Sequence, residues 1–309
     1  MKHIRSLFDI SIDEFHEILN VAASIKRELA EGKRIDYLKN HTLALIFEKA
    51  SLRTRVSFEA GMSQLGGTAL YLTGDVGWRE RESIADFARV LAEYCDFIVC
   101  RAISQSTVDE LASHNVIPII NGLTDHAHPC QALADFMTMR ECVGELAGKQ
   151  VTFVGDGNNV ARSLLNACAL GRVKFRLAGP AAYQISQAYI DRVKEHAGWI
   201  DFEQSTDTAR LVKNADFLYT DVWTSMGQEA EAAERTNAFR PYQINCELMK
   251  MAPKHCKVLH CLPARRGQEI TDEVIESEQS LVFPEAGNRM HVQKGLLVWL
   301  ARTNQMISI

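Results

Sequence analysis

The run Thr42-Leu-Ala-Leu-Ile-Phe47, followed after a short gap by Ser51-Leu-Arg-Thr-Arg55, decides the fold of the first half of this chain. The first part is an apolar, strand-like run, and the second opens a helical apolar pattern that continues through Met62. Ser51 is expected to cap the N-terminus of that helix. A strand that hands over to a helix through a tight turn is the repeating unit of parallel α/β sheets.

The same turn carries two arginines and two hydroxyl side chains. Free backbone N–H groups and the helix dipole attract an anion at a helix N-terminus. Arginine adds a rigid fork of donors that fits phosphate oxygens. Because a cation at this end opposes the dipole, two arginines without an anion would be unfavourable, so we interpret Ser51–Arg55 as a phosphate-binding turn. The alternative is a solvated basic first turn.

Strand-like runs alternate with helical patterns along the whole chain of 309 residues. A chain of this length suits two domains of roughly 150 residues each. We therefore predict two doubly wound parallel-sheet α/β domains of similar size, joined by interdomain helices that include one over 128–142. The domains are expected at 1–135 and 136–287, with the C-terminal helix 288–309 packing back on the first. The strands are expected at 42–47, 68–72, 96–100 and 116–120, and at 151–154, 174–178, 200–203, 216–220, 257–260 and 281–283.

Composition argues against several classes of protein. The net charge is −5 with both signs mixed throughout, so we expect no nucleic-acid partner. We also expect no signal peptide and no membrane span, because no apolar run is long enough for either. The eight cysteines form no C-x-x-C pair and show no metal-ligand spacing, which predicts no metal and a reducing, cytoplasmic setting.

Polar residues follow the expected strands, where α/β proteins bind ligands. Each of these residues could bind a ligand or could have an ordinary structural role. Arg101 could be a surface residue at a strand end. His128 and Gln131 share a helix face and could hold an oxygen, or form a capping turn. Asp221 could bind a cationic amine, or make an Asx turn. Cys261 could be a nucleophile, an electrostatic partner if ionised, or a buried structural cysteine.

The segment Gly155-Asp-Gly-Asn-Asn159 raises the question of a dinucleotide site. Its third glycine position is occupied by Val160, and no acidic residue ends the next strand at 174–179. Both features count against such a site. A tight turn that presents asparagines to a small ligand fits better. Arg289, near the start of the last helix, repeats the arrangement of a cation at a helix N-terminus.

Taken in order, these segments resemble one family, the ornithine carbamoyltransferases of the aspartate/ornithine transcarbamoylase superfamily. The matching segments span nearly the whole chain: Phe47-Glu-Lys-Ala-Ser-Leu-Arg-Thr-Arg-Val-Ser-Phe-Glu59, Asn121-Gly-Leu-Thr-Asp125, His128-Pro-Cys-Gln131, Gly155-Asp-Gly-Asn-Asn159, Asp221-Val-Trp-Thr-Ser-Met-Gly-Gln-Glu229 and His260-Cys-Leu-Pro263. Several independent motifs in a fixed order make a chance match implausible.

The resemblance implies transfer of the carbamoyl group of carbamoyl phosphate to the δ-amine of L-ornithine, without a metal or organic cofactor. It implies these carbamoyl phosphate-binding residues: Ser51, Leu52, Arg53, Thr54, Arg101, His128, Gln131, Cys261, Leu262 and Arg289. It implies these ornithine-binding residues: Asn159, Asp221, Ser225 and Met226. The catalytic residues would be Arg53, Arg101, His128, Asp221 and Cys261. It also implies a homotrimer, in arginine biosynthesis or the arginine deiminase pathway.

Two departures from the family pattern leave alternatives open. Leu52 stands where the family turn usually has threonine, and Trp78 lies in a loop where ornithine enzymes more often have Gln-Leu-Gly. Both features resemble the enzymes that act on acylated ornithine, whereas the intact Ser225-Met-Gly227 favours free ornithine. A carbamoyltransferase for N-acyl-ornithine or putrescine, and a non-catalytic relative that binds the ligand, are therefore the alternatives.

Overall fold

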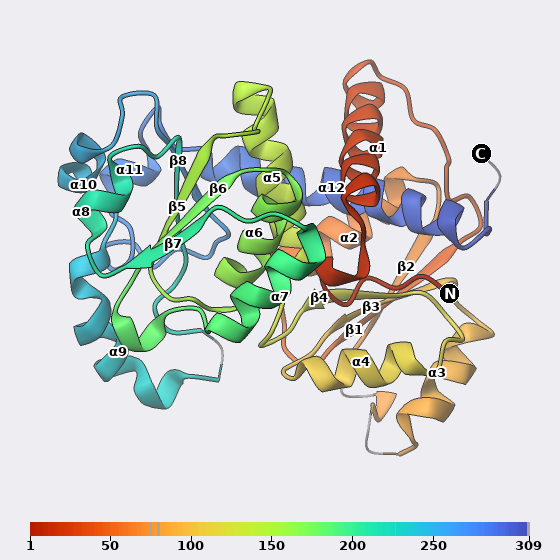
Figure 1. The fold of residues 1–309 in the computed structure, drawn as a ribbon. Coiled ribbons are helices and arrows are strands. Elements are labelled where there is room, and N and C mark those ends of the chain that lie inside the picture. The colour runs from red at the N-terminus through yellow and green to blue at the C-terminus, as the bar shows by residue number, and fades with distance from the viewer. Residues whose placement is uncertain (74–75, 79–80, 226, 308–309) are drawn as a thin grey trace. The chain divides into compact units, whose positions relative to one another are not determined.

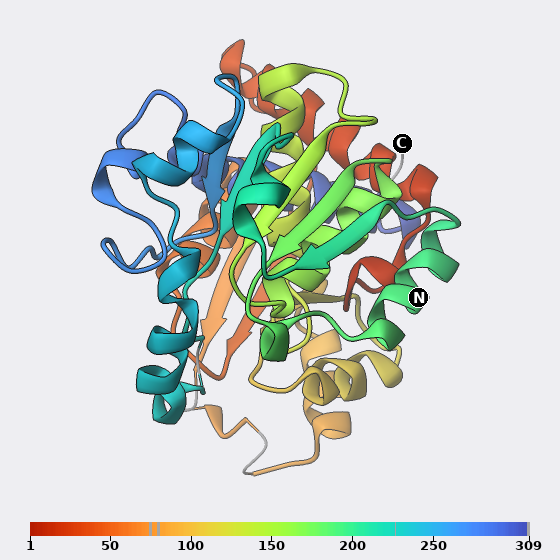
Figure 2. The same ribbon diagram turned by 60° about the vertical axis from the view of Figure 1, so that its left-hand side comes forward.

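The computed structural model describes residues 1–73, 76–78, 81–225 and 227–307. It divides into two compact units, one formed by Met1–Ala134 with Asn288–Ile309 and the other by Asp135–Gly287. Each unit contains one parallel sheet covered by helices (Figures 1 and 2). The expected fold class, two doubly wound α/β domains, is confirmed.

The first unit is built on a four-stranded sheet in the order β2-β1-β3-β4. Its strands are β1 (Thr42–Phe47), β2 (Thr68–Leu72), β3 (Phe97–Arg101) and β4 (Ile119–Leu123). Helices α1 (Ile12–Ala30) and α2 (Leu52–Gln64) lie on one side of the sheet, and α3 (Ile84–Ala92) and α4 (Gln105–Ser113) on the other (Figure 1). This layering follows because successive side chains along a strand point to opposite faces of the sheet, so both faces can be covered by helices.

Alternate residues of the central strands pack against the α3–α4 layer. Ala44 and Ile46 of β1 join Phe87 of α3 and Leu111 of α4 in one buried cluster. Their neighbours, such as Leu45, are equally buried and point to the opposite face. A strand that is buried on both faces has a continuous run of apolar residues, and this run made β1 recognisable from the sequence.

The second unit has a five-stranded sheet in the order β7-β6-β5-β8-β9. Its strands are β5 (Gln150–Val154), β6 (Lys174–Ala178), β7 (Phe202–Ser205), β8 (Phe217–Thr220) and β9 (Lys257–His260). Its helices are α6 (Asn159–Leu170), α7 (Gln187–Ala197), α8 (Thr208–Val212), α9 (Ala232–Phe239), α10 (Cys246–Met251) and α11 (Asp272–Ile275). Residues of α8 to α11 pack with Val154, Leu218 and Val258 in one buried cluster.

Helices α5 (Pro129–Val143) and α12 (Val282–Thr303) each contain a point where the chain passes from one unit to the other. The expected strand at 281–283 is wrong, because α12 begins at Val282, earlier than the expected 288. Pro284 is tolerated in the first turn of a helix, where its missing N–H would have no intrahelical partner. Helix α1 begins with a capping box formed by Ser11 and Glu14. None of the described helices has the length and apolarity that a membrane span requires.

Each sheet reverses its winding direction between two neighbouring strands. In the first unit the chain moves outward from β1 to β2 and then from β3 to β4, so the reversal lies between β1 and β3. In the second unit the reversal lies between β5 and β8. Open α/β sheets bind ligands beyond the carboxyl ends of the strands at such a point. Both units therefore present a candidate site there.

Candidate active site

The candidate anion site of the first unit begins at the N-terminus of α2, directly after β1. Ser51 caps the helix, and its Oγ accepts a hydrogen bond from the Thr54 N–H at 3.4 Å. The expected cap is thus confirmed. Leu52 is the first helical residue, and its side chain is 75% exposed. Only its backbone N–H, which has no intrahelical acceptor at this position, is therefore suited to an anion.

Several side chains of the candidate anion site donate hydrogen bonds to the hydroxyl oxygen of Thr54. It accepts hydrogen bonds from Arg289 Nη2 at 2.9 Å, from Ser51 Oγ at 3.1 Å and from Arg101 Nη1 at 3.4 Å. Thr54, Arg101 and Arg289 are all buried. Three segments far apart in the chain thus bring two guanidinium groups to the capped end of α2.

His128 lies close enough to these arginines for their charges to affect its pKa. It is buried, and its pKa lies well below the ordinary 6.5 because burial and the charges of Arg289, Arg101 and Arg53 all oppose protonation. The imidazole is therefore neutral at physiological pH. A neutral imidazole can donate one hydrogen bond to a carbonyl oxygen.

We expect His128 to make stability depend on pH. In the unfolded chain it binds a proton below its ordinary pKa of 6.5, whereas in the folded protein it does not. The contribution of His128 to stability is therefore greatest above pH 6.5 and falls below it, by about 1.4 kcal/mol per pH unit for one proton. In urea denaturation between pH 5 and 7.5, the parent should lose about this much more stability per pH unit below pH 6.5 than His128→Gln, because all other titrating groups are common to both proteins. Equal slopes would contradict the neutral assignment.

Gln131 and Arg55, which belong to the same two segments as His128 and Arg53, have different surroundings. Gln131 is fully buried in the first turn of α5 and follows His128 by three residues. Arg55 instead pairs with Glu59 at 3.0 Å and lies over the Tyr71 ring at 3.9 Å. The two arginines of the turn are thus separated, with Arg53 near His128 and Arg55 against β2.

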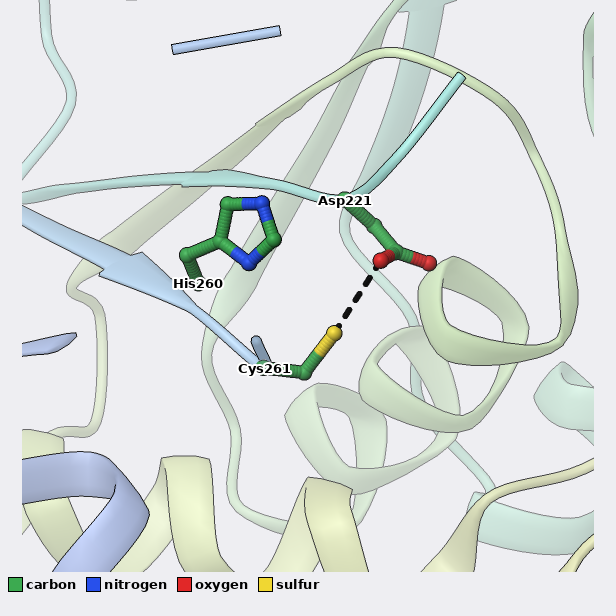
Figure 3. Close-up of side chains that lie close together, drawn as sticks. All are labelled: Asp221, His260 and Cys261. Carbon is green, nitrogen blue, oxygen red and sulfur yellow. Dashed lines mark hydrogen bonds between the residues drawn. The ribbon is translucent and has the colours of Figure 1, made fainter. Parts of the chain in front are cut away.

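The second unit places a carboxylate, an amide and a thiol together at its own reversal point. Asp221, directly after β8, accepts a hydrogen bond from Asn158 Nδ2 at 2.8 Å. It accepts another from the Cys261 thiol at 3.1 Å, which Figure 3 shows. The backbone N–H of the next residue, Val222, donates a third hydrogen bond to this carboxylate at 2.8 Å. These hydrogen bonds fix the orientation of the carboxylate, which suits it to binding a cationic amine.

Cys261 is a thiol rather than a thiolate. Its pKa is raised well above 9.0, first because it is buried and then because Asp221 accepts its proton and carries a like charge. The alternative of an ionised cysteine is therefore wrong. A neutral thiol beside a carboxylate can orient a ligand but is a poor nucleophile.

His260, Cys261 and Asp221 have ligand atoms within 4.8 Å of one another, which raises the question of a metal. Both ring nitrogens of His260 are already engaged. Nδ1 accepts the Leu262 N–H at 2.9 Å, and Nε2 meets Glu269 at 3.0 Å. Because both ring nitrogens already have partners, this donor set is better explained as an internal hydrogen-bond network than as a metal site.

The remaining expected residues of this side lie on the turns that follow β5 and β8. Asn159 is buried at the first position of α6. Its neighbour Asn158 is the N-cap, which accepts from the N–H groups of Val160 and Ala161 and donates to Asp221. Ser225 is half-buried on the loop after Asp221, and the expectation for Met226 lies outside the described residues.

Comparison with known proteins decides the family. A model described as aspartate/ornithine carbamoyltransferase, carbamoyl-P binding domain, matches residues 2–141, and one described as its Asp/Orn binding domain matches residues 147–300. The chain belongs to the aspartate/ornithine carbamoyltransferase family. Ornithine carbamoyltransferases from Archaeoglobus fulgidus and Anoxybacillus flavithermus are each 46% identical to it, over 97% of this chain and 97% and 96% of theirs. The structure of the Pyrococcus furiosus enzyme matches with a TM-score of 0.92 at 46% identity, over 96% of each chain.

Arg235 of this carbamoyltransferase was not found by sequence reasoning. It is buried on α9, forms an ion pair with Asp156 and donates to the Trp223 carbonyl at 2.5 Å. It therefore ties the loop after β8 to the turn after β5. No local pattern marks it, because Asp156 lies 79 residues away.

Trp78, one of the departures from the family pattern, packs within its own unit. Its ring meets Phe87 edge-to-face at a centroid distance of 4.7 Å, and its Nε1 donates to Glu48 at 3.4 Å. Only 8% of the residue is exposed. In this chain the tryptophan is therefore a core residue, whereas the neighbouring positions 74, 75, 79 and 80 lie outside the described residues.

Proposed function

We propose that this protein transfers the carbamoyl group of carbamoyl phosphate to the δ-amine of L-ornithine, giving L-citrulline and phosphate. The observation that carries the proposal is the convergence of Arg101 and Arg289 on Thr54 at the capped end of α2. Its relatives named ornithine carbamoyltransferase support the choice of amine.

On the carbamoyl phosphate side, the chain's own cations supply the electrostatics. The phosphate is held by Ser51, the Leu52 N–H, Arg53, Thr54, Arg101 and Arg289. The carbamoyl group is held by His128 and Gln131. Attack on the carbonyl builds negative charge on its oxygen and on the leaving phosphate. Donors fixed in place before the reaction stabilise that charge without reorganisation, and this stabilisation is usually the main source of an enzyme's rate enhancement.

On the ornithine side, Asp221 and Ser225 hold the α-amine, and Asn159 with the Met226 backbone holds the carboxylate. Cys261 and the Leu262 backbone orient the reacting groups. The δ-amine has an ordinary pKa near 10.4 if it resembles lysine, so it must lose a proton before it attacks. Since Cys261 keeps its own proton, the departing phosphate is the final acceptor in this scheme.

The proposal is tested by a screen of amines with carbamoyl phosphate and the purified protein. Citrulline from free ornithine, formed faster than any other product, is the expected result. Preferential carbamoylation of acetylornithine, succinylornithine or putrescine would move the substrate to a related amine. Phosphate release with no amine carbamoylated, or ligand binding without turnover, would contradict the proposed activity.

We also propose that the protein is a homotrimer. Support comes from apolar side chains that the single chain leaves in solvent around α2 and β2, namely Leu52, Val56 (49% exposed) and Leu70 (43% exposed). Val56→Glu is expected to shift sedimentation velocity profiles from trimer to monomer. Val143→Glu, at a similarly exposed valine on α5, is the matched control and should leave the trimer intact. A monomeric parent, or a trimer unaffected by Val56→Glu, would contradict this assignment.

A cytoplasmic location in arginine metabolism completes the proposal. None of the eight cysteines, all of which lie among the described residues, is in a disulfide, and six of them are buried. Such thiols are typical of proteins kept in a reducing compartment.

A further inference from the structure

Two carboxyl groups that are not assigned to a substrate meet inside the second unit. Asp135 lies on α5 and Glu285 on the first turns of α12, and both are fully buried. The two side chains are hydrogen-bonded to each other. A hydrogen bond between two carboxyl groups requires a proton on one of them.

Glu285 also receives donors from two strands. Its Oε2 accepts the backbone N–H of His260, at the end of β9, at 2.8 Å. Its Oε1 accepts the hydroxyl of Tyr219, on β8, at 3.2 Å. The carboxyl pair therefore joins α5, α12, β8 and β9 at one buried point.

The surroundings oppose a second negative charge. Burial first, and then the charge and hydrogen bond of Asp135, raise the pKa of Glu285 well above 4.5. The titratable groups that face the pair are Tyr219, Cys168 and Cys261, and the pKa of each is raised, so that each stays neutral. The pair thus holds a single shared proton at neutral pH, because two carboxylates in contact cannot both ionise there.

We propose that Asp135 and Glu285, sharing one proton, are positioning residues for the amine half of the reaction. Glu285 fixes the backbone of His260, the residue before Cys261, whose thiol lies 3.1 Å from Asp221. Along the chain, Asp135 follows Gln131 by one helical turn, and Glu285 precedes Arg289 by one turn. The role rests on the proposed function, since it orients groups assigned to ornithine.

The test compares Glu285→Gln with Glu285→Leu. Glutamine keeps an oxygen for the His260 N–H and donates to Asp135, as the protonated acid does, whereas leucine does neither. We expect kcat/KM for ornithine within about threefold of the parent for Glu285→Gln and at least about tenfold lower for Glu285→Leu. KM for carbamoyl phosphate should change little in either. A folded Glu285→Leu with parental kcat/KM, or a Glu285→Gln as impaired as Glu285→Leu, would overturn the proposal.

A second readout needs no turnover of ornithine, so it separates this proposal from the proposed function. Alkylation of Cys261 by iodoacetamide, followed by mass spectrometry, should be several-fold faster in Glu285→Leu than in the parent or Glu285→Gln. Unchanged labelling would contradict positioning. If the parent carbamoylates no ornithine but the labelling pattern holds, the proposed function fails and the positioning role stands.

The shared proton gives a third measurement, which still decides the matter if Glu285→Leu does not fold. The folded parent binds one proton more than the unfolded chain above pH 4.5, the ordinary glutamic acid value. Its unfolding constant should therefore rise with pH about tenfold more per unit than that of Glu285→Gln between pH 5 and 7. Identical pH dependence in the two proteins would overturn the shared proton.

Discussion

Replacing Arg53 with alanine is expected to lower kcat by about 10²–10³-fold, the usual effect of removing one donor to charge that develops in a transition state. Arg53 lies at the start of α2 and acts electrostatically on His128, so its charge reaches the groups assigned to carbamoyl phosphate. Steady-state citrulline formation measures the effect. Thermal unfolding should change little, because Arg53 as a whole is only partly buried.

Arg55→Ala is the matched control for this prediction. It removes the same side chain two positions along the same helix, where the guanidinium pairs with Glu59 and lies over Tyr71. Its turnover is expected to stay close to that of the parent, since an exposed ion pair of this kind contributes little. Equal losses in both variants, or near-normal turnover in Arg53→Ala, would remove Arg53 from the phosphate site.

Asp221→Ala is expected to lower kcat/KM for ornithine by about 10²-fold or more, because truncating one partner of a buried charge pair costs several kcal/mol. It should leave the affinity for carbamoyl phosphate nearly unchanged. The variant removes the carboxylate that accepts from Asn158 and Cys261, and with it the charge assigned to the α-amine. Initial rates with each substrate varied in turn separate the two effects.

Asp207→Ala serves as the control for Asp221. Asp207 caps α8 in the same unit and accepts the Arg210 N–H at 3.0 Å. Its loss should cost about 1 kcal/mol of stability without changing the kinetics. If Asp221→Ala raised KM for both substrates alike, the assignment of Asp221 to the amine would be wrong.

The sequence predicted the nine strands of the described residues, most of them as apolar runs that end in a turn. Two were placed imprecisely, because β4 spans Ile119–Leu123 rather than 116–120 and the largely polar β7 spans Phe202–Ser205 rather than 200–203. The prediction failed at 281–283, where a short apolar run followed by proline is equally compatible with a strand end and a helix start. Periodicity cannot separate these when the run is so short. The polar residues at strand ends were predicted because parallel strands all end at one edge of their sheet.

What could not be predicted were contacts between side chains far apart in the chain. Arg289 reaches Thr54 across 235 positions, and Arg235 reaches Asp156 across 79. Neither pair has a spacing that a local pattern could reveal. The different surroundings of Arg53 and Arg55 follow from helical geometry, which turns residues two apart to nearly opposite sides.

The most direct test of the account is a crystal structure of the protein with a phosphonate mimic of carbamoyl phosphate. We expect the phosphonate at the N-terminus of α2, within hydrogen-bond distance of the guanidinium groups of Arg53, Arg101 and Arg289. Ordered phosphonate density at any other position, with these three arginines making no contact to it, would contradict the account.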